Sequence, residues 1–323
     1  MSLAVCAGVL AAGQARGRAT ASTPSQSAIP RQDGHPDLEG FWTNDTFTPL
    51  ERPAKFRDKE FFTHDEAVAF VKEQNDRVLG QSKDNIHYDD AIWQTENYGK
   101  FENLRTSLVV EPRNGLLPPL TPEGQRRLPQ QRATQRGLSF DSAQTRSLGE
   151  RCITWGNVGP PMLPPTYYAN LQILQVSDQL IIRHELLDAL RIIHMDGRSH
   201  PAPSLRWLAG HSVGKWEGDV LVVDTTNFTE RTNFRGSPQT SRQDVFATER
   251  VHVTERFTPL DRDTLRYQFT VDDPDTWTTP WSGEMMIRRM EGPLYEYACH
   301  EGNYGMPNIL RGARVAERAG TSR

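Results

Sequence analysis

Alternation of apolar and polar residues dominates the second half of the chain. From residue 169 onward, runs of strand length follow one another, rich in Val, Ile, Leu and aromatic residues. Because the side chains of a strand point alternately to its two faces, such runs predict strands that bury one face. We therefore expect nine strands, over residues 169–176, 179–186, 189–195, 208–217, 219–227, 248–257, 264–271, 283–290 and 293–301.

Short polar turns separate most of these runs. Strands joined in this way predict an antiparallel meander, and closure into a barrel leaves no strand edge unpaired. We expect a mainly β protein whose meander closes into a lipocalin-like up-and-down barrel. The pairs that favour tight reversals are Ser177-Asp178, Asp196-Gly197, Glu217-Gly218 and Glu291-Gly292.

The first half of the chain predicts helices and loops packed on this barrel. Thr63 and Glu66 have the spacing of a capping box, so a helix should begin at Thr63. Thr121, directly before a proline, marks a second helix start. Short strands are expected around Phe41 and over residues 107–112.

The N-terminus has the composition of a secretory leader. A short apolar run precedes small-residue tracts that match signal-peptidase sites, so we interpret residues 1–21 as a signal peptide. The Ser/Thr/Pro/Gln-rich residues 22–34 predict a disordered leader. Export to the periplasm or the exterior follows, and the alternative is a cytosolic protein with an unstructured N-terminus.

Cysteine usage agrees with export. The chain has three cysteines, and Cys6 would leave with the signal peptide. Cys152 and Cys299 then form an even pair, which is typical of a disulfide in an oxidising compartment. Two buried free thiols are the alternative.

Charge and hydropathy argue against two classes of partner. The formal net charge is −4, and no run of Lys or Arg provides a basic surface for nucleic acid. No apolar run approaches the roughly 20 residues that a membrane-spanning helix needs. A small molecule is therefore the expected partner, and the oligomeric state is left open.

Histidines mark the candidate chemistry. Four of the nine histidines fall between residues 179 and 224. His184-Glu185 and His300-Glu301 are neighbouring pairs, and a general base with an orienting carboxylate needs these residue types. We expect His184 or His300 to act as the base and the glutamates to orient it or act as the acid. Arg191 would stabilise a developing oxyanion.

The period of two sorts these side chains onto faces. His184 shares the more apolar face of its strand with Leu180. Arg183, Glu185 and Arg191 are expected to form a charged ladder on the opposite side. The pattern leaves open which face lines the lumen.

Further aromatic and polar side chains are candidates for binding a substrate. His184, His200, His211, His252 and His300 could also hold a divalent metal if they converge. No HExxH or CxxC motif supports a metal, so no cofactor is expected. The candidate binding residues are Trp155, Asn157, Tyr168, His200, His211, His252, Trp277, Trp281, Tyr295 and Tyr297.

Several motifs are similar to those of a family of exported bacterial proteins that is frequent in soil lineages. They are spread over nearly the whole mature chain, so the resemblance implies one domain over residues 35–318. It implies no activity, and the lipocalin-like description is an analogy of strand count and order. The motifs are TPLERP (48–53), LPPLTP (117–122), ERCITW (150–155), WEGD (216–219), DTTNF (224–228) and YEYACHEGNYGM (295–306).

Two functions fit these patterns. The first is an exported lyase, hydrolase or isomerase that acts on a small organic or glycosidic substrate by His/Glu acid–base chemistry. The alternative is a periplasmic, lipocalin-like carrier that binds a small apolar ligand without catalysis.

Overall fold

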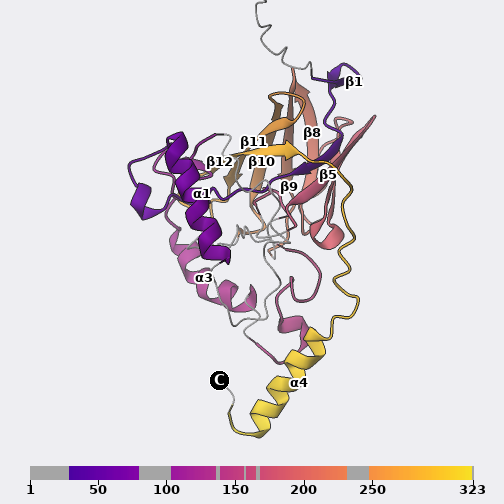
Figure 1. Cartoon of the computed structure of the whole chain (residues 1–323). Helices are drawn as coiled ribbons and strands as arrows, with labels where there is room; N and C mark the ends of the chain where they lie inside the picture. The colour runs from indigo at the N-terminus through magenta and orange to yellow at the C-terminus, as the bar shows by residue number, and fades with distance from the viewer. Residues whose placement is uncertain are drawn as a thin grey trace, which may run out of the picture.

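A computed structural model describes residues 29–79, 103–135, 139–155, 158–164, 168–230 and 247–321 (Figure 1). The expected signal peptide over residues 1–21 and the candidate residue Asn157 lie outside these ranges.

Nine of the described strands close into a barrel, which confirms the expected fold class. Around the barrel, β11 is followed by β10, β9, β8, β7, β6, β5, β3 and β12, and β12 pairs with β11 to close the ring. The strands are β3 (Gly40–Thr43), β5 (Asn170–Val176), β6 (Gln179–His184), β7 (Leu190–His194), β8 (His211–Glu217), β9 (Val220–Thr226), β10 (His252–Pro259), β11 (Thr264–Asp272) and β12 (Trp281–Arg289).

The strand that completes the ring is β3 and not the predicted strand over residues 293–301. β3 lies between β5 and β12, where Trp42 pairs with Leu171 on one side and with Arg289 on the other. Farther along β12, β4 (Val109–Glu111) takes up the same edge. No edge of these strands is therefore left for residues 293–301 to pair with, and these residues form loops and turns instead.

One pair of neighbouring strands departs from the expected antiparallel meander. β7 and β8 run parallel, with Ile193 opposite Ser212 and His194 opposite Val213. Parallel neighbours need a long crossover and not a tight turn. Here residues 195–210 provide it, and this crossover shapes one end of the outer barrel wall.

The apolar faces of the strands point into the barrel, which answers the question that the sequence left open. Leu180 and Ile182 are buried there, as are Val223 and Phe257 from the other side of the ring. Trp42 belongs to the same core cluster. The lumen is thus largely a packed core built from alternate residues of each strand.

Helices lie outside the barrel (Figure 1). α1 (His64–Leu79) begins with the predicted capping box, because the Thr63 amide donates to Glu66 and the Glu66 amide donates to Thr63. α3 (Pro122–Gln135) begins with Thr121 accepting from the Gly124 amide. α4 (Gly305–Arg318), which was not predicted, extends below the barrel. Short 3-10 helices are η1 (Ala54–Phe56), η3 (Ala143–Thr145) and η4 (Leu186–Asp188).

Two ends of the described chain are tied to the rest. β1 (Arg31–Gln32) and β2 (His35–Pro36) form a small hairpin, so the disordered leader predicted to reach residue 34 is wrong for its last residues. Cys152 and Cys299 form the expected disulfide, which ties the C-terminal segment to the loop before the barrel.

Within the described ranges, no helix combines the length and apolarity needed to cross a bilayer.

Candidate functional site

A polar network occupies the barrel lumen around Arg191. Arg191 Nη1 donates to Glu255 Oε1 over 2.9 Å, and Nη2 bonds the second oxygen of the same carboxylate. The guanidinium also donates to the hydroxyls of Ser212 and Thr225, each over 3.0 Å. The Tyr267 hydroxyl donates to Glu255 over 2.7 Å. Arg191 therefore makes four hydrogen bonds to three side chains of the protein, and these bonds leave it poorly placed to bind an oxyanion.

The charged ladder expected on β6 and β7 is wrong. The strand register places Ile182 opposite Arg191, so these two side chains share the inner face. Arg183 points the other way and forms a half-exposed ion pair with Asp188 at 2.5 Å. The pattern assigned each strand two faces correctly, but it did not match the faces of neighbouring strands.

His184 lies in the lumen on the same face as Leu180 and Ile182. It is 5 % exposed. Burial and, second, the positive charge of Arg191 lower the pKa of His184 to about 3, so the imidazole is neutral at pH 7. Its Nε2 has no hydrogen-bond partner among the described residues. As a base, it would act only on a group that enters the barrel.

The two predicted His/Glu pairs do not meet. Glu185 is buried beside η4, where it accepts a hydrogen bond of 2.7 Å from Asn170, and burial raises the pKa of its carboxyl. His300 and Glu301 are exposed residues of a turn before α4. The five histidines considered as metal ligands do not all converge, because His184 is inside the barrel and His300 lies beyond its last strand.

The aromatic candidates divide between core and surface. Trp277 and Trp281 are 2 % and 1 % exposed and pack edge to face in the core. They are therefore not positioned to stack on a substrate at the surface. Trp155 is partly buried against Gly149. The ring centroids of Tyr168 and Tyr297 are 4.9 Å apart, whereas Tyr295 is 73 % exposed.

Histidines from β7, β8 and β10 and one from the crossover gather around Asp224 of β9 on the outer wall of the barrel. His200 Nε2 lies 2.8 Å from Asp224 Oδ1, and His252 Nε2 bonds Asp224 Oδ2. His200 Nδ1 lies 3.0 Å from His211 Nδ1. The ring of His211 stacks on His194, with 5.1 Å between centroids. We call these five residues the outer-wall relay.

Hydrogen bonding in the relay determines the tautomers. Because the Asp224 carboxylate only accepts, His200 Nε2 carries the proton, and Nδ1 of a neutral His200 is an acceptor. The 3.0 Å contact between the two Nδ1 atoms then requires His211 Nδ1 to donate. His211 Nε2 has no hydrogen-bond partner in the described part of the chain, so its lone pair is free. The relay thus ends in a nitrogen that can accept a proton.

Charges within the relay favour this arrangement. Burial, followed by the neighbouring His200 and His194, lowers the pKa of His211, which keeps it neutral near pH 7. The hydrogen bond to Asp224 raises the pKa of His252 above its ordinary 6.5. The pKa of Asp224 is lowered: burial acts to raise it, but the bonds to His252 and His200 outweigh that effect. The carboxylate is therefore ionised and held between two imidazoles.

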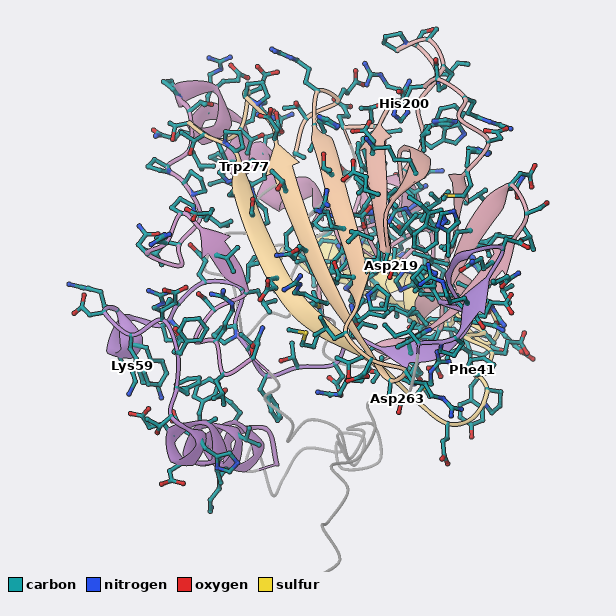
Figure 2. The ribbon with its side chains drawn as sticks, turned by 90° about the horizontal axis from the view of Figure 1, so that it is seen from above. Phe41, Lys59, His200, Asp219, Asp263 and Trp277 are labelled. Carbon is teal, nitrogen blue, oxygen red and sulfur yellow. A yellow bond between two sulfur atoms is a disulfide. The ribbon has the colours of Figure 1, made fainter. Side chains whose placement is uncertain are left out.

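The crossover is fixed to the end of β9, which positions His200. The Asn227 side-chain amide donates to the carbonyls of Ala202 and Leu205 over 3.1 and 2.9 Å. Asn227 itself has a left-handed backbone with φ of 60°, a conformation that asparagine tolerates better than most residues. Figure 2 shows His200 and Trp277 at the same end of the barrel, opposite Asp263.

Gly210 allows β8 to begin close to β9. Its φ is +68°, and a Cβ there would lie 2.7 Å from both the Thr225 methyl and the Thr226 carbonyl oxygen. Any larger residue would displace the start of β8 and with it His211. Close backbone approach at a glycine is thus part of how the relay is built.

The sequence identified part of this site. His200, His211 and His252 were predicted to bind substrate, but Asp224 and His194 were not assigned a role. Asp224 occupies the outward face of its strand after an apolar run, a pattern that indicates an ordinary solvated residue. Only the register, which places Asp224 opposite Val213 and Thr254, reveals its central position.

Replacing Asp224 by Asn should lower the pKa of His252 toward its ordinary value, because the neutral amide, unlike the carboxylate of Asp224, does not balance the charge of an imidazolium. The stabilisation from His252 is present below pH 6.5 and is lost as pH rises through its folded pKa. That from Asp224 is present above pH 3.8 and is lost as pH falls. The difference in stability between the variant and the wild type should therefore be largest between pH 3.8 and pH 6.5.

Titration of the histidine side chains by NMR measures the effect on His252 directly. Asp219→Asn is the matched control, because Asp219 pairs with Arg31 away from the relay. Identical titration of His252 in wild type and Asp224→Asn would contradict the proposed coupling.

Among the described residues, no group of three or more His, Cys, Asp or Glu side chains has an arrangement suited to hold a metal ion. No family model matches the chain, and no curated protein or solved structure shows significant similarity to it.

Proposed function

We propose that the protein is an exported enzyme that uses the outer-wall relay for acid–base chemistry on a small organic substrate. The observation that carries the proposal is the chain of contacts from Asp224 through His200 to His211, whose hydrogen bonding assigns the free lone pair to His211 Nε2. A lyase, hydrolase or isomerase needs such a base to remove a proton from its substrate or from an attacking water.

Each member of the relay has a defined task. Asp224 orients His200 and stabilises positive charge that develops on it when a proton moves along the relay. His211 accepts the proton at Nε2 and, as it becomes cationic, is stabilised through His200. His252 holds the second oxygen of Asp224 and thereby fixes the carboxylate.

An apolar surface beside the relay supports a substrate with an apolar part. Leu174, Ile181 and Ile192 form one row across β5, β6 and β7 on the outer wall. Leu174 and Ile192 are 37 % and 41 % exposed. His194, two residues beyond Ile192 on the same face, connects this row to His211. A substrate could thus place apolar atoms on the row and its reacting group at the relay.

Other observations bear on export and on the carrier alternative. The leader-like N-terminus and the disulfide between Cys152 and Cys299 favour an oxidising compartment. A carrier of the lipocalin type needs an open lumen, whereas the Arg191–Glu255 pair and aromatic side chains occupy the one described here. The enzyme is therefore the better-supported proposal.

The test is a substrate screen with His211→Asn. Purified protein would be assayed against esters, lactones, glycosides and phenolic compounds. Loss of the base should lower turnover of any accepted substrate by about 10²–10⁴-fold, with an unchanged circular dichroism spectrum and thermal midpoint.

His300→Asn is the informative comparison, because the sequence assigns His300 the same role and the structure places it in an exposed turn. Normal turnover by His211→Asn and its loss in His300→Asn would overturn the proposal. An inactive wild type that retains an apolar ligand in native mass spectrometry would favour the carrier.

A further inference from the structure

A second site lies at the disulfide, away from the relay. A cavity of about 410 Å³ opens between the loop before the barrel and the segment that follows β12. This volume is within the range of small-molecule sites. The residues that line it include Glu150, Cys152, Tyr168, Glu296, Tyr297 and Asn303.

Two tyrosines form a corner of the cavity. The rings of Tyr168 and Tyr297 are 4.9 Å apart between centroids and stand at 86° to each other. The main-chain amide of Tyr297 donates to Asp188 over 3.3 Å, which ties this wall to η4. Perpendicular aromatic walls are the arrangement by which proteins surround an organic cation, since each ring presents electron-rich π density.

The backbone around the cavity is held in unusual conformations. Tyr168 and Cys152 both have left-handed backbones, with φ of 57° and 55°. Neither residue type adopts this region readily, and such residues cluster at functional sites. The disulfide and the Asn303 amide, 3.5 Å from both Cys152 Sγ and the Glu150 carbonyl oxygen, join the two segments.

The charged groups that line the cavity are all acidic. Glu150 is engaged by Arg146 at 2.7 Å and by Ser147. Glu296 is exposed and makes no hydrogen bond or ion pair with the described residues. Among the described residues that line the cavity there is no Lys, Arg or His. A carboxylate without a partner and two aromatic walls thus face the same space.

We propose that this cavity binds a small organic cation of the quaternary ammonium class. The tyrosine corner contacts the cation through its ring faces, and Glu296 balances the charge. The site is independent of the outer-wall relay, so it can exist whether or not the relay is catalytic.

The experiment compares choline with its neutral isostere, 3,3-dimethylbutan-1-ol, by calorimetric titration of the full chain at constant ionic strength. The two ligands have the same shape, so only charge separates them. Choline should bind at least about tenfold more tightly than the alcohol, as expected for a cation held between two aromatic ring faces and a carboxylate.

Variants locate the site. Tyr297→Leu and Glu296→Gln should each weaken choline binding severalfold, whereas Tyr295→Leu should leave it unchanged because Tyr295 is exposed and does not line the cavity. His211→Asn should also bind choline normally, which separates this site from the proposed function. Equal binding of both ligands, failure of choline to bind, or equal loss in Tyr295→Leu would overturn the proposal.

Discussion

Replacing Arg191 by Met is expected to lower the free energy of unfolding by about 3–5 kcal/mol, because it leaves a buried charge without its partner. Glu255 is fully buried, and Arg191 provides two of its hydrogen bonds. The hydroxyls of Ser212 and Thr225 lose a donor as well. Urea denaturation followed by tryptophan fluorescence at pH 7 measures the change.

Two controls separate the charge from the volume of the side chain. Arg183→Met removes a half-exposed pair with Asp188 on the same sheet and should cost below about 1 kcal/mol. Arg191→Met combined with Glu255→Leu removes both charges and should recover much of the lost stability. If Arg191→Met and Arg183→Met lowered the free energy of unfolding equally, the buried Arg191–Glu255 pair would contribute no more to stability than the half-exposed Arg183–Asp188 pair.

Removing the disulfide with Cys152→Ser and Cys299→Ser should be the other large change in stability. The cross-link spans 147 residues of sequence, and a loop of that length restricts the unfolded chain by about 5 kcal/mol in the chain-entropy account. The midpoint of urea denaturation should fall, while the far-ultraviolet circular dichroism of the folded barrel stays the same.

Reduced wild-type protein is the matched comparison for the double serine variant, since it has the same missing bond without a change of sequence. The two should unfold at the same denaturant concentration. An unchanged midpoint in both would mean that the segment after β12 contributes nothing to global stability through its cross-link.

The barrel was predictable because period-two patterns are local. The alternation around Leu180 and Ile182 identifies the buried face of one strand without knowledge of its neighbours. The capping box at Thr63 and Glu66 is equally local, and both features occur in the structure. The ring order was less accessible, because nothing near Phe41 indicates that its strand pairs with β12.

The candidate site was only partly predictable because it depends on register. His200 and His211 were recognised as residue types that carry chemistry, but Asp224 became central only once β9 lay between β8 and β10. The parallel step from β7 to β8 creates the crossover that brings His200 there. A single sequence does not report which strand is inserted beside which, so convergence of distant side chains stays hidden.

Placement of β3 between β5 and β12 has a consequence for synthesis of the chain. Thr43, near the start, pairs with Arg288, near the end. Such pairings give a high contact order, and each of them forms only after the chain has lost the conformational entropy that closing a long loop requires. A nascent chain that stops before residue 281 cannot complete its ring. Ribosomal release of β12 is therefore the earliest moment at which the barrel can seal.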